Sequence, residues 1–145
     1  MRRGRPGLPD QVEMVLYDLA IVGGGPAGLT LAERAAAGGA RVCVLDPRTP
    51  WEKPCGGGLS PRAAELFPFL AAPDTGSVET DQARLVSPHG LGVTIAGGKP
   101  FLVVSRLELA RRLLDRATQA GAEHVPCRVA SVVRERSQHC DCPRH

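Results

Sequence analysis

Six residues near the start of the chain have the types and spacing of a phosphate-binding turn. The run Gly23-Gly24-Gly25-Pro26-Ala27-Gly28 satisfies the pattern G-x-G-x-x-G. In this pattern the first glycine permits a tight turn, the second lets the backbone approach a pyrophosphate, and the third lets a helix pack close to a sheet. The N-terminus of that helix offers free N–H groups and the positive end of its dipole to the phosphates. We therefore expect a dinucleotide-binding turn here.

One acidic residue stands where such a site needs it. Asp46 follows Gly28 by 18 positions and ends an apolar run. An acid at this point accepts hydrogen bonds from ribose hydroxyls and disfavours a 2′-phosphate, so the pattern favours FAD or NAD over NADP. The chain has 17 glycines, and the motif could also mark a turn that binds nothing, with Asp46 a solvated loop acid. The order of elements around the motif favours binding.

Those elements form a strand–helix–strand unit. Leu19–Val22 and Val42–Leu45 are short apolar runs typical of strands buried in a parallel sheet. Between them, Pro26 suits the first turn of a helix, Ala27–Ala37 continue it, and Gly38-Gly39 end it. The order predicts an α/β fold of Rossmann type, with a parallel sheet in a three-layer arrangement.

The rest of the chain predicts a second unit and a return to the first. Residues 47–58 are expected as a loop, Pro61–Leu70 as a short helix capped by Ser60, and the glycine-punctuated stretch 78–104 as two or three antiparallel strands. Ser105 and Glu108 match a capping box at the start of an amphipathic helix that Gly121 closes. Further strands are expected at Val125–Cys127 and Val129–Val133.

Composition excludes several classes of protein. The net charge is +3, and no basic stripe with interleaved aromatics is present, which argues against nucleic-acid binding. The five cysteines are odd in number and irregular in spacing, so we expect neither a disulfide framework nor a metal site. This cysteine usage predicts a reducing, cytoplasmic location.

No stretch approaches the ~20 apolar residues of a membrane span. Arg2-Arg3 could begin an export signal, but the apolar run that follows leads directly into the glycine motif.

Three segments resemble a known family of flavoproteins. Tyr17–Asp46 resembles the N-terminal FAD fingerprint of the glutathione-reductase superfamily. Lys53-Pro54-Cys55-Gly56-Gly57-Gly58-Leu59 resembles the K-x-C-G-G-G-L stretch of the geranylgeranyl reductase family, within the para-hydroxybenzoate-hydroxylase-like flavoproteins. Ser105–Leu109, which opens the second long helix, is similar to their next conserved block. The resemblance covers about residues 15–135.

The resemblance implies FAD as the cofactor and a role for each matching position. The pyrophosphate would be held by the turn residues Gly23, Gly25, Pro26, Ala27 and Gly28. Asp46 would bind the adenosine ribose, and Val129 would bind the adenine through its backbone. Cys55 and Gly56 would lie near the flavin, and Arg106 would lie beside the phosphates and the ribityl chain. In the whole enzyme, reduced flavin would deliver hydride to isoprenoid double bonds. The partners of that enzyme would be an apolar substrate and an electron donor, and a peripheral contact with a membrane surface stays open. The catalytic residues are not identified.

Two alternatives stay open at this point. One is an aromatic-ring monooxygenase of the same superfamily, and the other is a non-catalytic adenine-nucleotide-binding fragment. Family members are two or three times as long, and their second cofactor block is not found here, so we expect an N-terminal fragment whose last residues look frameshifted. The expected organisation is a leader at 1–13, FAD-binding segments at 14–60 and 105–136, a partial substrate domain at 61–104, and an irregular tail at 137–145.

Overall fold

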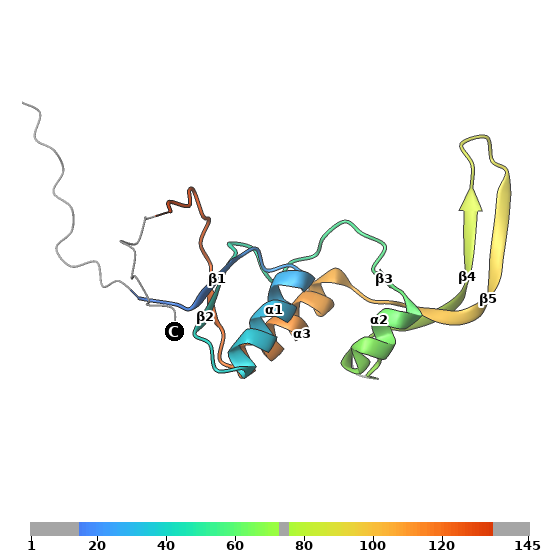
Figure 1. The fold of residues 1–145 in the computed structure, drawn as a ribbon. Helices are drawn as coiled ribbons and strands as arrows, with labels where there is room; N and C mark the ends of the chain where they lie inside the picture. The colour runs from blue at the N-terminus through green and yellow to red at the C-terminus, as the bar shows by residue number, and fades with distance from the viewer. Residues whose placement is uncertain (1–14, 73–75, 135–145) are drawn as a thin grey trace, which may run out of the picture.

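A parallel sheet of three strands forms one part of the computed structural model, which describes residues 15–72 and 76–134 (Figure 1). Its strands are β1 (Leu19–Val22), β2 (Val42–Leu45) and β6 (Glu123–Val125), in the order β1-β2-β6. Leu19 lies opposite Val42 and Cys43 opposite Glu123, and both pairings are parallel. The predicted parallel sheet is confirmed, and Cys43 in its central strand is buried as expected.

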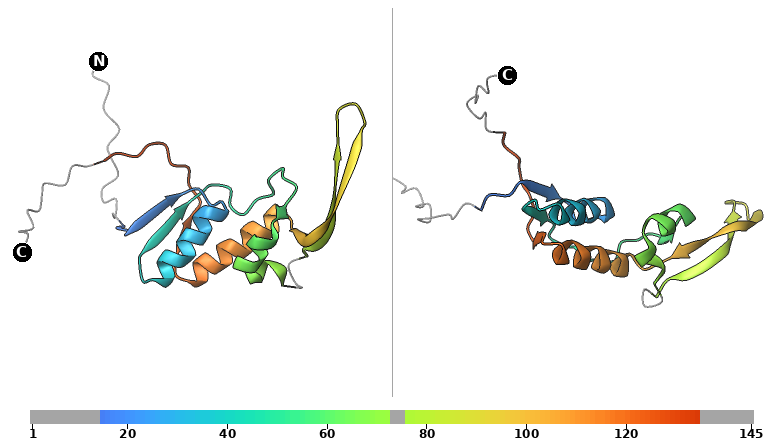
Figure 2. Two further views of the ribbon diagram at one scale, coloured as in Figure 1. Left: turned by 45° about the vertical axis from the view of Figure 1, so that its right-hand side comes forward. Right: turned by 60° about the horizontal axis from the view of Figure 1, so that its bottom comes forward.

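Two helices lie side by side on one face of this sheet (Figure 2). Helix α1 (Pro26–Ala37) packs against β2 and α3 (Arg106–Gln119) packs against β6, while the two helices contact each other. The core between these layers is formed by apolar side chains, among them Ile21, Leu29, Ala32, Val42, Val44, Leu109, Leu113 and Ala117. A helical layer on the opposite face, which the three-layer expectation requires, is not present in the described part of the chain.

Both helices begin and end where local chemistry requires. Pro26 occupies the first helical position of α1, and the chain leaves this helix through Gly38 and Gly39, whose φ of +89° is costly for other residues. The Ser105 hydroxyl accepts the Glu108 N–H at the start of α3, as predicted. The reciprocal half of the capping box does not form, because the Glu108 carboxylate pairs with Arg112 one turn further on.

A second, antiparallel sheet projects from the first part as a long hairpin (Figure 1). It consists of β3 (Gly58–Leu59), β5 (Gly92–Val103) and β4 (Val78–Val86), in the order β3-β5-β4. The stretch 78–104, predicted as two or three antiparallel strands, contains two, and the third strand of the sheet begins at the end of the predicted 47–58 loop. Before the hairpin, one predicted helix is two short elements, α2 (Pro61–Leu66) and η1 (Pro68–Ala71), because Phe67 leaves the helical region ahead of Pro68.

The C-terminal strand predictions need correction. Strand β6 ends at Val125, two residues before the predicted end, and Val129–Val133 form no strand. Val132 and Val133 are 83% and 81% exposed, so their apolar pattern finds no neighbouring strand in the described residues. A strand needs a hydrogen-bonded partner as well as a suitable sequence. The expected leader 1–13 and tail 137–145 lie outside the described residues.

Candidate dinucleotide-binding site

The glycine turn joins β1 to α1 at the carboxyl end of the parallel sheet. Gly23 has a φ of +108°, a conformation that favours glycine, and its N–H donates to the Leu45 carbonyl oxygen at 3.0 Å. A Cβ atom on Gly28 would lie 2.2 Å from the Gly23 carbonyl oxygen, so the expected close approach of helix and turn is present. A Cβ atom on Gly25 would meet no protein atom within 4 Å. Gly28 therefore serves packing, whereas Gly25 borders open space.

The middle glycine of the turn is required by a residue that sequence reasoning missed. A Cβ atom on Gly24 would lie 2.4 Å from the hydroxyl oxygen of Thr49. That hydroxyl donates to the Gly24 carbonyl oxygen at 2.7 Å, and Thr49 is buried. The loop after β2 is thus packed directly onto the glycine turn.

Asp46 ties the same two loops together through its carboxylate. One oxygen accepts the Gly24 N–H at 2.8 Å, and the other accepts the N–H groups of Arg48 at 2.8 Å and Thr49 at 3.0 Å. Burial raises the pKa of Asp46, but the N–H donors and the nearby Arg48 charge outweigh it and lower the pKa overall. A carboxylate has about four acceptor positions. Asp46 is therefore a fixed, ionised acid that already holds much of the site in shape.

A cavity of about 590 Å³ opens at the carboxyl ends of β1, β2 and β6. Its lining includes Gly23 and Asp46 from the two predicted segments, together with Val22, Leu45, Pro47, Arg48, Cys127, Arg128 and Val129. Ligands of open parallel sheets bind outside the carboxyl ends of the strands, which is this position. The predicted adenine residue Val129 thus lies with the predicted ribose residue Asp46, although Val129 is not in a strand.

A second cavity, of about 240 Å³, lies on the helix side of the glycine turn. It is lined by Gly25, Pro26 and Arg106, which were predicted to lie near the phosphates, and by Gly24, Asp46, Arg48, Thr49, Trp51, Lys53, Leu109 and Ala110. Three of these residues carry positive charge, and Asp46 is the one acid among them. The predicted residue Ala27 lines neither this cavity nor the larger one; it borders a shallow depression on the outer face of α1.

The segment Cys55–Gly58 contains a contact to Arg106, but its residues line neither cavity. The Arg106 Nη1 donates to the exposed Cys55 Sγ at 3.8 Å. The Gly57 N–H, Arg106 and Lys53 lower the pKa of the Cys55 thiol. Gly57 has a φ of +65°, and a Cβ atom there would lie 2.1 Å from the Val104 carbonyl oxygen. Gly57 is therefore packed against Val104 and fixes the middle of the glycine run, which a purely flexible linker would not show.

Glu52 is a further residue that sequence reasoning missed. Its carboxylate accepts the N–H groups of Arg106 at 3.0 Å and Leu107 at 3.1 Å, in addition to the Ser105 hydroxyl. These donors lower the pKa of Glu52, and the carboxylate compensates the positive end of α3. The Arg106 side chain is left with a buried Nε that has no hydrogen-bond partner among the described residues. An acceptor beside Arg106 would satisfy this donor.

The fold and the glycine turn define a Rossmann-type nucleotide-binding domain. The family model described as NAD(P)-binding Rossmann-like domain matches residues 21–60. The described residues contain no helix long and apolar enough to cross a membrane. Within the same residues, no group of three or more metal-binding side chains occurs.

Over about three quarters of its length, the chain is homologous to geranylgeranyl reductases, which confirms the sequence resemblance. It is 40% identical to geranylgeranyl diphosphate reductase of Rhodobacter capsulatus over 75% of this chain and 27% of the relative. It is 55% identical to menaquinone reductase of Mycobacterium tuberculosis over 72% of this chain and 28% of the relative. The chain thus spans less than a third of the length of these relatives.

Solved structures agree with this relationship. A geranylgeranyl bacteriochlorophyll reductase-like protein from Thermoplasma acidophilum is 28% identical, with a TM-score of 0.60 over 74% of this chain and 29% of that one. The halogenase PltM in complex with phloroglucinol and FAD has a TM-score of 0.64 at 20% identity, over 82% of this chain and 29% of that one. The second likeness concerns the fold alone.

Proposed function

We propose that this chain is the FAD-binding segment of a flavin-dependent oxidoreductase that reduces carbon–carbon double bonds of isoprenoid substrates. The observation that carries the nucleotide-binding part of the proposal is the pair of adjoining cavities that both border Asp46 and Arg48. The reductase part rests on the similarity to geranylgeranyl diphosphate reductase. One lies where adenosine binds in open parallel sheets, and the other lies at the glycine turn and the N-terminus of α1, where phosphates bind.

The residues present fit an adenine dinucleotide without a 2′-phosphate. Gly25 leaves its side of the turn open to a pyrophosphate, and three cations line the phosphate cavity. Arg106 brings a buried donor that needs an acceptor. At the other end, the ionised Asp46 favours a free ribose hydroxyl over a 2′-phosphate, which supports FAD rather than a phosphorylated dinucleotide.

Each part of the chain has its own task in this proposal. Asp46 and Val129 bind the adenosine, the turn from Gly23 to Gly28 orients the pyrophosphate, and Arg106 holds the chain that leads from it to the flavin. The flavin, when bound, supplies the hydride. Cys55 and Gly56 would face the flavin end, and the packing of Gly57 against Val104 fixes their loop.

The proposed domain division is that of a nucleotide-binding unit from 14–60 and 105–136, interrupted by a partial substrate domain at 61–104. The course of the chain supports it, because the chain leaves the parallel sheet after β2, forms the antiparallel sheet, and returns to the parallel sheet through α3 and β6. All three cysteines in the described part of the chain, Cys43, Cys55 and Cys127, are free thiols, which supports a reducing, cytoplasmic compartment.

The substrate class is a molecule that carries a polyisoprenoid chain. The names of the Rhodobacter and Mycobacterium relatives, geranylgeranyl diphosphate reductase and menaquinone reductase, both denote reductases of such molecules. The packed Cys55–Gly58 loop, which resembles that of the reductases, favours this class over an aromatic monooxygenase. We propose the activity for the whole enzyme of which this chain resembles the first part.

Nucleotide binding tests the proposal at the level of this chain. We expect ADP to bind more tightly than FMN, because the two cavities serve the adenosine and the pyrophosphate. Isothermal titration with ADP and quenching of FMN fluorescence would measure both affinities, with FAD as the full ligand. If FMN saturates the chain at a lower concentration than ADP, the assignment of the cavities is wrong. If neither ligand binds at millimolar concentration, the chain is not a nucleotide-binding module.

A further inference from the structure

Two residues border both cavities, and they differ in what they still offer a ligand. Asp46 and Arg48 line the cavity at the strand ends and the cavity at the glycine turn. The Asp46 carboxylate already accepts three backbone N–H groups. Among the described residues, no carboxylate forms an ion pair with the Arg48 guanidinium. A ligand that extends from one cavity to the other therefore passes an arginine with free donors.

Trp51 holds this arginine in a defined position. The guanidinium carbon of Arg48 lies over the Trp51 ring, 4.5 Å from its centroid. A guanidinium stacked on an aromatic face keeps its N–H groups around its rim, where they can bind oxygens in the plane of the group. The backbone N–H of Arg48 is fixed by Asp46, so the side chain is held at both ends. Part of the side-chain freedom that ligand binding would cost is therefore already lost.

The surrounding charges select an anion. Lys53 and Arg106 line the cavity at the glycine turn together with Arg48, and Trp51 contributes its ring to the same lining. A pyrophosphate carries two negative charges and offers planar pairs of oxygens that suit a guanidinium fork. Sequence reasoning gave Arg48 no role, since one arginine in a proline-rich loop has no motif around it.

We propose that Arg48, stacked on Trp51, pairs with the pyrophosphate of the bound dinucleotide where it passes from the ribose cavity to the phosphate cavity. Arg48 is thereby a specificity residue that distinguishes a nucleoside diphosphate from a nucleoside. The inference rests on the proposed nucleotide-binding function and adds a residue to it. It makes no use of the hydride-transfer chemistry.

Binding to a graded series of ligands tests this role. NMR titration of the isotope-labelled chain with adenosine, AMP and ADP measures even millimolar affinities. We expect Arg48→Gln to weaken ADP binding about 10-fold, the loss of one charge-assisted contact, and to change adenosine binding less than about twofold. Trp51→Leu removes the platform but not the charge, so it should weaken ADP binding about threefold and leave adenosine binding unchanged.

Matched variants separate the role from general charge effects. Arg111→Gln makes the same charge change on the exposed side of α3, outside both cavities, and should leave ADP affinity as in the unaltered chain. Arg48→Lys keeps the charge without the planar fork and should recover part of the loss. Far-UV circular dichroism verifies that each variant is folded.

The outcomes distinguish this inference from the function on which it rests. If the unaltered chain binds neither adenosine nor ADP, the proposed function fails and the role of Arg48 fails with it. If the chain binds ADP and Arg48→Gln binds it equally well, the function stands and the role of Arg48 is refuted. Equal losses of adenosine and ADP in Arg48→Gln would also refute it, because Arg48 would then not act through the phosphates.

Discussion

Glu52 and Ser105 share the N-terminus of α3, although 53 positions separate them in the sequence. The Ser105 hydroxyl donates to the Glu52 carboxylate at 2.6 Å while it accepts the Glu108 N–H at 3.3 Å. The contact connects the loop after β2 to α3, the helix that leads the chain back to the parallel sheet at β6. The chain segments before and after the antiparallel sheet are thus joined by a hydrogen-bonded pair as well as by the core.

This contact predicts the effect of Ser105→Ala. The substitution removes the N-cap acceptor and one donor to Glu52, and we expect it to lower the free energy of unfolding by about 1 kcal/mol. Urea denaturation followed by circular dichroism measures the change. Ser131→Ala, in an exposed irregular segment, is the control and should have no measurable effect. Equal stability of the two variants would show that the cap contributes nothing.

Acid should destabilise the fold through Asp46 and Glu52. Both carboxyl groups have pKa values lowered in the folded state, Asp46 by N–H donors that outweigh burial and Glu52 chiefly by the Ser105 hydroxyl. Their stabilisation is complete above the unfolded pKa values of about 4 and is lost as the pH falls through the folded values. Urea midpoints between pH 7 and pH 3 test this. In Asp46→Asn the urea midpoint should decrease less between pH 7 and pH 3 than in the unaltered chain. An equal decrease would show that Asp46 does not contribute to the acid sensitivity.

The two outer glycines of the G-x-x-G half-motif should respond differently to alanine. Gly28→Ala brings a Cβ against the Gly23 carbonyl oxygen, and we expect a loss of about 1–3 kcal/mol in the free energy of unfolding. Gly25→Ala meets open space at a φ of −79°, so stability should change by less than about 1 kcal/mol while ADP affinity falls. Thermal unfolding and ADP titration of both variants give the comparison. The reverse pattern would contradict the division between packing and binding.

Loss of the Asp46 charge should weaken nucleotide binding. We expect Asp46→Asn to cost about 1–3 kcal/mol in ADP binding, because a charge-assisted acceptor for ribose is removed. The amide oxygen keeps part of the contact to the glycine turn, which makes Asn gentler than Ala on the fold. Asp18→Asn is the matched control, since Asp18 pairs with Arg41 away from both cavities. Unchanged ADP affinity in Asp46→Asn would mean that Asp46 does not contact the ribose.

The 145-residue chain alone should not turn over substrate. Hydride transfer requires the flavin ring and the double bond to be held in reacting geometry, and the chain spans less than a third of its relatives. The test is anaerobic incubation with FAD, dithionite and a prenyl diphosphate, followed by mass spectrometry. Saturated product above the protein-free control would show that these residues suffice for the reaction.

Local signals were enough to predict the strand–helix–strand unit. Leu19–Val22 and Val42–Leu45 are apolar on both faces, and Pro26 and Gly38 mark the helix between them, so composition and boundaries agree. For the hairpin, the sequence predicted two or three strands over 78–104 with glycines between them, and the structure has two. Gly97 and Gly98 do not end β5, since they lie where the register shifts between Thr80 and Gln82 and the longer strand accommodates extra residues.

The contacts that complete the candidate site could not be predicted in this way. Thr49 matters because its hydroxyl reaches Gly24, and Glu52 matters because it reaches Ser105. Neither contact leaves a periodic or motif signal, because each joins loops far apart in the sequence. The same reason explains the failure at Val129–Val133, where an apolar stretch lacks the neighbour that a strand requires.

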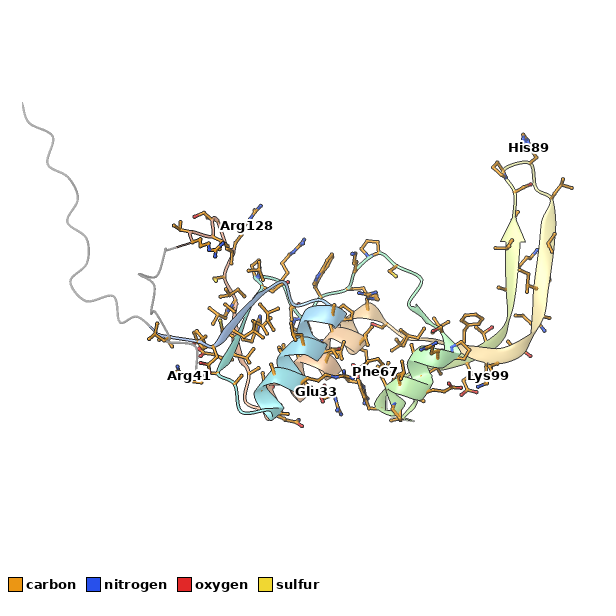
Figure 3. All side chains as sticks on the ribbon, viewed as in Figure 1. Glu33, Arg41, Phe67, His89, Lys99 and Arg128 are labelled. Atoms are coloured by element: carbon orange, nitrogen blue, oxygen red, sulfur yellow. The ribbon has the colours of Figure 1, made fainter. Side chains whose placement is uncertain are left out.

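The β4–β5 hairpin divides the molecule into regions of unequal local stability. From Ala83 to Ile95 every residue except the half-buried Ser87 is exposed, and His89 at the tip lies far from Arg128 beside the parallel sheet (Figure 3). Two strands without a core beneath them open at little cost, whereas β2 opens only when the layers around it separate. Amide protons of the outer hairpin should therefore exchange with solvent many times faster than those of Val42–Leu45. The glycine turn and Asp46 directly follow β1 and β2, in the part of the chain that should exchange slowly.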